Sequence, residues 1–182
     1  MKYFFLVIIF ISFTSKVSAS FKNNIIQNLQ NTKNLSFNFE QNINGELQNG
    51  DCVIEYPKKI FCKYDLKNKK ILVSNGRSLV IKTNTSYYIY SIEKTPLNLI
   101  LDKNILIEKI YNLDERLIDG NLINYSINEN DNTINVFFDN KTFDLIGWQN
   151  TDPYQNFNIT FLSSIRKNRN ISKNLFKIPK QN

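Results

Sequence analysis

Alternation of apolar and polar residues along most of the chain is the feature that most constrains its fold. The segment from Leu35 to Glu40 places Leu35, Phe37 and Phe39 on one face and polar residues on the other. A period of two is typical of an antiparallel strand with one face in a core and the other in solvent. The alternation returns several times between turn residues, so the sequence predicts a mainly β fold, a long antiparallel meander.

Turn signals divide this meander. Gly45 and Gly50 are expected in a connection, and Asn75-Gly76 is the strongest hairpin signal in the chain. Later turns are expected at Asp119-Gly120, Asn130-Asp131 and Asp139-Asn140. The segments expected to form strands are 35–40, 52–56, 60–64, 71–73, 79–81, 87–90, 117–119, 122–127, 133–138, 143–148 and 156–161, with 175–179 as a last short strand or edge segment.

Two helical segments are expected beside the sheet. Apolar residues recur at helical spacing after Ser20, a residue type that caps helices: Phe21, Ile25, Ile26 and Leu29. A short apolar helix is expected over 95–101, with Thr95 as N-cap and Pro96 at the first helical position. An apolar face of a curved sheet must be closed into a barrel or covered. The helices could form this cover over an interior suited to an acyl chain, or complete an ordinary core.

The N-terminus predicts export. Lys2 precedes an apolar run over residues 3–13, and Val17-Ser18-Ala19 is a small-residue sequence typical of signal-peptide cleavage. The run is shorter than the roughly 20 residues of a membrane-spanning helix. We therefore expect residues 1–19 to be a signal peptide and residues 20–182 to form one soluble domain outside the cytoplasm.

Composition argues against enzyme chemistry. The chain contains no histidine, the usual general base near neutral pH and the commonest metal ligand. Two cysteines are too few for a four-ligand zinc site. The net charge of +7 is dispersed along the sequence, which is weak evidence for nucleic-acid binding. We therefore expect no catalytic residues, no metal, no cofactor and no nucleic-acid partner. Acidic residues stand in turn-like contexts instead of a glycosidase pair: Asp114, Glu115, Asp119, Asp131, Asp139 and Asp144.

The two cysteines fit a hairpin. Pairing the strands about Pro57 places Cys52 opposite Cys62, on one face with Ile54 and Ile60. An exported chain meets an oxidising compartment, which favours a disulfide over two buried free thiols. Loop-closure entropy gives such a bridge roughly 3 kcal/mol of stabilisation.

Several segments, in order and spacing, resemble the periplasmic outer-membrane lipoprotein carrier proteins of LolA type. They are 35–41, 50–57, 60–64, 72–76 followed by Leu79, 95–101, 142–149 and 176–179. The resemblance implies an unclosed antiparallel β-barrel under a helical lid, with a cavity for the acyl chains of lipoproteins. Such a carrier takes its cargo from an ATP-driven transporter in the inner membrane. It delivers the cargo to the outer membrane or an acceptor there, without covalent chemistry. We expect a periplasmic monomer; the alternative is a periplasmic adaptor with a filled core that binds a protein partner.

The alternation and the resemblance together give candidate site residues, each of which could also be plain core. The lid stripe is Leu97, Ile100 and Leu101, and Trp148 is interpreted as packed core. The family often has Arg before the proline of the second hairpin, where it hydrogen-bonds the lid; here Tyr56 is the latch candidate. We expect Tyr56→Phe to change lipid release more than stability. The residues expected on the concave, lipid-binding face are Phe37, Phe39, Ile54, Ile60, Leu79, Ile81, Tyr88 and Tyr90.

Overall fold

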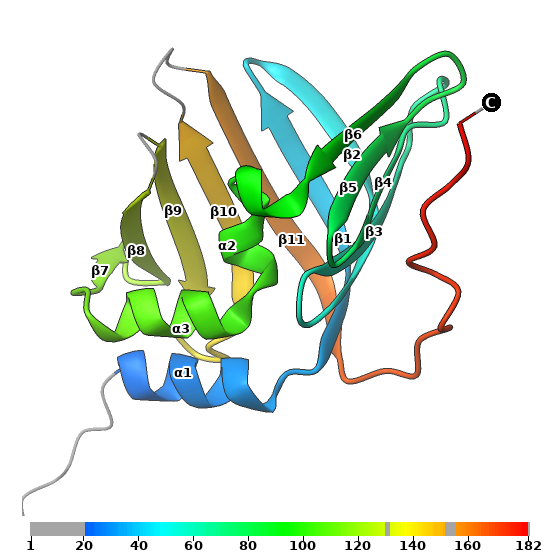
Figure 1. Ribbon diagram of the computed structural model, residues 1–182. Helices are drawn as coiled ribbons and strands as arrows, with labels where there is room; N and C mark the ends of the chain where they lie inside the picture. Colours follow the sequence, from blue (N-terminus) through cyan, green and yellow to red (C-terminus); the bar gives the residue numbers. More distant parts are fainter. Residues whose placement is uncertain (1–20, 130–131, 152–155, 182) are drawn as a thin grey trace, which may run out of the picture.

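One antiparallel sheet curves around helices in the computed structural model, which describes residues 21–129, 132–151 and 156–181 (Figure 1). The expected signal peptide, Ser20 and the turn Asn130-Asp131 lie outside the described residues. The strands are β1 (Asn34–Ile43), β2 (Glu46–Glu55), β3 (Lys59–Tyr64), β4 (Ile71–Asn75), β5 (Ser78–Lys82), β6 (Tyr87–Ser91), β7 (Arg116–Ile118), β8 (Leu122–Glu129), β9 (Asn132–Asp139), β10 (Leu145–Thr151) and β11 (Phe157–Lys167). The helices are α1 (Phe21–Asn31), the 3-10 helix η1 (Ile92–Lys94), α2 (Leu97–Leu101) and α3 (Lys103–Tyr111).

The strand order explains why the barrel is open. The order is β6-β5-β4-β3-β2-β1-β11-β10-β9-β8-β7, so β6 and β7 form the two edges of the sheet. Between them the chain runs through η1, α2 and α3, on the concave side of the sheet in Figure 1. This confirms the expected unclosed barrel with helices. The predicted meander, in which consecutive strands pair, is correct within β1–β6 and within β7–β11. The pairing of β1 with β11 joins these two halves of the sheet.

The connection expected between Gly45 and Gly50 is wrong, because the first hairpin turns more tightly. Asn44 and Gly45 both have positive φ and form the turn, so β2 begins at Glu46 and passes through Gly50. Gly50 is required there by a close approach: a Cβ would lie 2.8 Å from the Phe39 ring and 2.1 Å from the Lys63 carbonyl oxygen. The missing side chain thus lets the Phe39 ring lie over β2.

The helical region differs from the prediction in two ways. The second expected helix is only α2, and Thr95 does not cap it, because the Thr95 hydroxyl donates to the Ile92 carbonyl at 2.8 Å. The longer helix α3 was not expected. Asp102 caps it by accepting hydrogen bonds from the backbone N–H groups of Asn104 and Ile105. An N-cap residue followed by apolar residues at helical spacing was the available signal.

The C-terminal segment is not a strand, which corrects the prediction for residues 175–179. It crosses the convex side of β3–β6 in Figure 1, and Phe176 is buried there with the Lys59 ammonium 5.8 Å from its ring centroid. The Tyr87 hydroxyl donates to the Pro179 carbonyl at 3.2 Å, which holds the segment against β6. The backbone N–H groups of Leu175 and Lys177 donate to the nearby carbonyls of Ser172 and Asn174 instead of to a neighbouring strand.

Apolar burial is concentrated between the concave face and the helices. Ile54, Ile60 and Leu101 are almost fully buried on one side of this core, and Tyr125 and Phe138 on the other. None of the helices in the described ranges is long and apolar enough to cross a membrane. The core therefore fixes the helices against the sheet and leaves a space between them unfilled.

Candidate functional site

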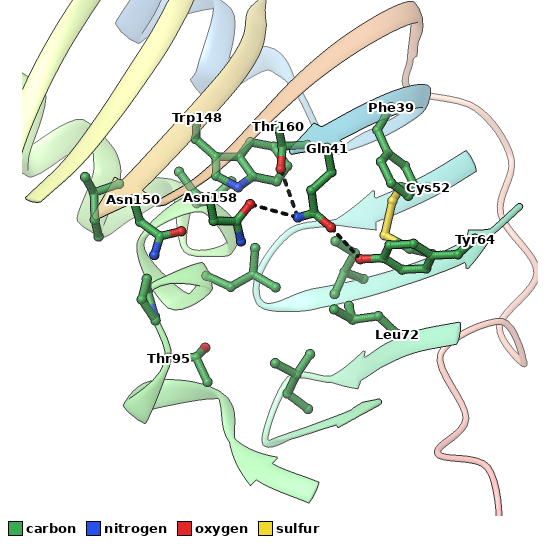
Figure 2. Close-up of a pocket in the computed structure, with 17 residues that line it drawn as sticks. Phe39, Gln41, Cys52, Tyr64, Leu72, Thr95, Trp148, Asn150, Asn158 and Thr160 are labelled. Atoms are coloured by element: carbon green, nitrogen blue, oxygen red, sulfur yellow. Dashed lines mark hydrogen bonds between the residues drawn. A yellow bond between two sulfur atoms is a disulfide. The ribbon is translucent and has the colours of Figure 1, made fainter. Parts of the chain in front are cut away.

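A cavity of about 220 Å³ lies between the concave face of the sheet and the segment η1–α2, which we call the lid (Figure 2). This volume is below the roughly 300–1,000 Å³ of typical ligand sites. The cavity is lined by Phe39, Gln41, Cys52, Ile60, Cys62, Tyr64, Leu72, Leu79, Thr95, Pro96, Leu97, Ile100, Ile134, Trp148, Asn150, Asn158 and Thr160.

One wall of the cavity is apolar. Ile60, Leu72 and Leu79 come from β3, β4 and β5, and Leu97 and Ile100 face them from α2. Cys52 and Cys62 are paired across β2 and β3 and form a disulfide in this wall. The predicted disulfide is therefore present, and it joins the two strands directly beneath the lid.

The opposite wall carries a row of polar side chains, Gln41, Asn150, Asn158 and Thr160, which we call the polar strip. Strand register places them side by side on β1, β11 and β10: Gln41 is opposite Thr160, and Asn158 opposite Asn150. The Gln41 amide nitrogen donates to Asn158 Oδ1 and to Thr160 Oγ1, both at 3.1 Å. The Tyr64 hydroxyl donates to Gln41 Oε1 at 3.2 Å, as Figure 2 shows.

Sequence reasoning missed the polar strip. In β11 the apolar residues alternate with polar ones, and the usual interpretation turns the apolar set inward. The observed register instead turns Asn158 and Thr160 toward the cavity. The exposed Phe161 lies on the convex face, where it stacks on Phe137 with ring centroids 5.9 Å apart. Gly147 leaves room for this stack, since a Cβ would lie 3.0 Å from the Phe161 ring.

The cavity lining is uncharged at neutral pH. Tyr64 is the titratable side chain among the described lining residues, and burial raises its pKa to about 12. The Lys70 ammonium lies 4.0 Å from the centroid of the Tyr64 ring and donates a hydrogen bond to Gln48 Oε1 at 2.8 Å. Burial lowers the pKa of Lys70, and the negative charge of Glu46 opposes that shift. Within the described residues, no group of His, Cys, Asp or Glu could hold a metal ion. The site is therefore suited to binding neutral groups.

Lys58 connects the β2–β3 turn to the lid. Its backbone N–H donates to the Leu101 carbonyl at 2.8 Å. Its ammonium lies 3.6 Å from Asp102 Oδ2 and 3.4 Å from Glu93 Oε1, at the two ends of the lid. The Lys58 carbonyl accepts from the Ser74 hydroxyl at 2.7 Å, which fixes the turn to β4. These contacts form a latch for the lid that the sequence did not reveal.

Tyr56, the expected latch residue, makes no hydrogen bond to the lid. Its hydroxyl is buried without a hydrogen-bond partner among the described residues, and burial raises its pKa. The Lys103 ammonium lies 5.7 Å from the Tyr56 ring centroid, and it donates to the Thr32 carbonyl at 2.8 Å. Tyr56 therefore packs beneath the start of α3, and its neighbour Lys58 makes the polar contacts.

The other expected site residues all lie on the concave side but not all at the cavity. Phe39, Ile60, Leu79, Leu97 and Ile100 line it, as does the buried Trp148. Phe37, Ile54 and Leu101 are buried in the adjoining core. Register places Ile81, Tyr88 and Tyr90 on the same face, beyond the lining, with Tyr88 and Tyr90 exposed. Contact of any of these residues with lipid stays a prediction.

Comparison with known proteins identifies the family. The family model described as "Outer membrane lipoprotein carrier protein LolA" matches residues 30–179. A search of curated proteins found no match. Among solved structures, a LolA superfamily protein from Nitrosomonas europaea is 8% identical, with a TM-score of 0.48 and 86% of this chain and 97% of that chain covered.

Two mycobacterial proteins are also similar. LprF from Mycobacterium bovis is 11% identical, with a TM-score of 0.46 and 84% of this chain and 94% of that one covered. The lipoprotein LppX of Mycobacterium tuberculosis is 12% identical, with a TM-score of 0.44 and coverages of 83% and 96%. Because the family match spans residues 30–179, most of the chain, the protein belongs to the outer-membrane lipoprotein carrier (LolA) family.

Proposed function

We propose that this protein is a periplasmic carrier, or chaperone, for lipoproteins. Its signal peptide, residues 1–19, is removed on export. The remaining domain binds the acyl chains of lipoproteins released by an ATP-driven transporter of the inner membrane. It then delivers them, as a monomer and without covalent chemistry, to the outer membrane or to an acceptor there.

The observation that carries this proposal is a cavity with one apolar wall, under a lid that is held by a small number of polar contacts. A cavity of about 220 Å³ is larger than the ~150 Å³ that holds one benzene molecule. It is nevertheless too small for whole acyl chains, so cargo has to displace the lid. The Lys58 contacts and the lid's own apolar residues set the free energy of that displacement.

The free-energy cost of opening the lid and the gain from burying an acyl chain are of similar size. Opening the lid exposes its four buried apolar side chains, which are Ile92, Leu99, Ile100 and Leu101, and costs roughly 6–12 kcal/mol at about 1.5–3 kcal/mol for each. Burying about eight to fifteen methylene groups of an acyl chain offsets this cost, at about 0.8 kcal/mol for each group. One acyl chain therefore suffices to hold the lid open, and the small difference permits release.

The test is release of lipoprotein from spheroplasts that contain the cognate transporter. Purified protein lacking residues 1–19 is incubated with them, and lipoprotein is counted in the soluble fraction. We expect a one-to-one soluble complex. The variant Leu72→Trp fills the cavity and should release little, whereas Leu117→Trp, at an exposed position on β7, should behave as the wild type.

Absence of release by the wild-type protein would contradict the carrier proposal. In that case the adaptor that binds a protein partner becomes the better interpretation. Equal release by Leu72→Trp and Leu117→Trp would show that cargo binds outside the cavity.

A further inference from the structure

The polar strip stands in a cavity whose other wall is apolar. Amide and hydroxyl groups that face an apolar ligand lose their hydrogen bonds to water, which costs free energy unless the ligand replaces them. A cavity for hydrocarbon alone has no use for such side chains. Because Gln41, Asn150, Asn158 and Thr160 all line the cavity, its ligand is expected to bring hydrogen-bonding groups to this wall.

The hydrogen bonds within the strip leave donors unused. Gln41 is fixed by Asn158, Thr160 and Tyr64, so it acts as a positioning residue. The side-chain N–H groups of Asn150, Asn158 and Trp148 have no hydrogen-bond partner in the described part of the chain. Figure 2 shows the Trp148 indole nitrogen on the side of the ring that faces Asn158. The wall therefore presents neutral donors from three residues of β10 and β11.

The absence of charged groups among the described residues of the cavity lining determines which kind of acceptor these donors can bind. A fatty-acid carboxylate entering this uncharged lining would lose water without gaining a counter-charge, which is costly. Lys70 is outside the lining and is already bound to Gln48. An ester or amide carbonyl is a neutral acceptor, so it satisfies the donors without that penalty.

We propose that the polar strip and Trp148 recognise the ester or amide carbonyl groups that join acyl chains to the head of an amphiphile. This inference rests on the proposed function and adds the part of the cargo that is recognised. The carbonyl oxygens accept hydrogen bonds from Asn150, Asn158 and Trp148, and the chains extend toward Leu72 and Ile100. The carbonyls can come from the diacylglyceryl group of a lipoprotein or from a membrane glycerophospholipid.

Diester and diether lipids test this recognition, because an ether link keeps the chains and removes the carbonyl oxygens. A short-chain diacyl lipopeptide and a short-chain glycerophospholipid are each compared with their diether analogues. Binding to the protein lacking residues 1–19 is followed by the fluorescence of Trp148, the one tryptophan of the chain. We expect the diester to bind about tenfold more tightly, which corresponds to about 1.4 kcal/mol.

Matched variants locate the effect. The Asn150 side chain makes no hydrogen bond in the described structure, so Asn150→Leu should fold normally and reduce the diester preference to below about threefold, a difference under about 0.7 kcal/mol. The control is Asn49→Leu, at an exposed position of β2 on the convex face of the sheet, away from the cavity. This variant should keep the full preference for diester over diether lipid. Circular dichroism checks that both variants are folded.

The outcomes separate this inference from the proposed function. Equal binding of diester and diether by the wild type, or equal loss of preference in both variants, overturns carbonyl recognition and leaves the carrier proposal intact. Failure of the wild type to bind any of the four lipids overturns the proposed function as well. A preference confined to the lipopeptide pair identifies lipoprotein as the source, and one confined to the phospholipid pair identifies membrane lipid; both support carbonyl recognition.

Discussion

Removing the Lys58 ammonium should loosen the lid. Lys58→Met keeps an unbranched apolar side chain and the backbone hydrogen bond to Leu101, and deletes the ion pairs. At 3.6 Å and an effective dielectric constant of about 20, the Coulomb attraction between the Lys58 ammonium and the Asp102 carboxylate is about 5 kcal/mol, before desolvation and side-chain ordering are subtracted. Desolvation and side-chain ordering oppose most of it, leaving about 1–2 kcal/mol. The partner Glu93 is 71% exposed, so it adds little.

A shift of about 1–2 kcal/mol raises the ratio of open to closed lid roughly 5- to 30-fold. Asp102→Asn tests the same ion pair from the other side. Asp102 Oδ2 faces Lys58 while Oδ1 accepts the hydrogen bonds that cap α3, and Asn is an equally good cap. In a double-mutant cycle, Lys58→Met and Asp102→Asn should show a coupling energy of about 1 kcal/mol.

Two observables report the lid. Hydrogen exchange of the Lys58 backbone amide measures how often its bond to the Leu101 carbonyl breaks. Acrylamide quenching of Trp148 measures water access to the cavity, because that side chain is only 8% exposed. Both should increase in Lys58→Met, and an apolar dye should bind faster.

The control is Lys63→Met, an exposed lysine on the convex face of β3. It should leave amide exchange, quenching and dye binding unchanged. If Lys58→Met behaves like Lys63→Met, or if the cycle gives no coupling with Asp102, the lid is held by apolar packing alone and the latch assignment is wrong.

Three further predictions concern stability. Replacing Cys52 and Cys62 by Ala should lower the free energy of unfolding by about 3 kcal/mol, measured by urea titration against the oxidised wild type. The sequence led us to expect that Tyr56→Phe would change lipid release more than stability, but the Tyr56 hydroxyl makes no hydrogen bond among the described residues. Removing this buried hydroxyl should instead raise the free energy of unfolding by about 1 kcal/mol with little effect on lipid release; a loss of stability would contradict this. Burial raises the pKa of Tyr64 from 10 to about 12, so folding favours the neutral phenol. The resulting contribution to the free energy of unfolding is complete below pH 10 and is lost as the pH rises through 12. Tyr64→Phe should therefore show a smaller loss of stability over that range, followed by circular dichroism.

Much of the fold could be predicted because strand alternation and hairpin signals are local properties. The pairing of Cys52 with Cys62 followed from counting residues on either side of Pro57, and register confirms it. The opening of the barrel and its helical cover followed from the family resemblance. The helix α3 could have been found from its Asp102 cap, since capping is also local.

The sequence by itself determined most of the strands, the disulfide and the apolar face of β1–β5, because each depends on residues close together along the chain. Only the tertiary structure decided that β1 pairs with β11, which brings Gln41 beside Asn158 and Thr160. It also turned the polar residues of β11 inward and set Lys58 against Asp102. These contacts join residues far apart in sequence, and no local pattern encodes which distant partner a strand or an ammonium group will meet.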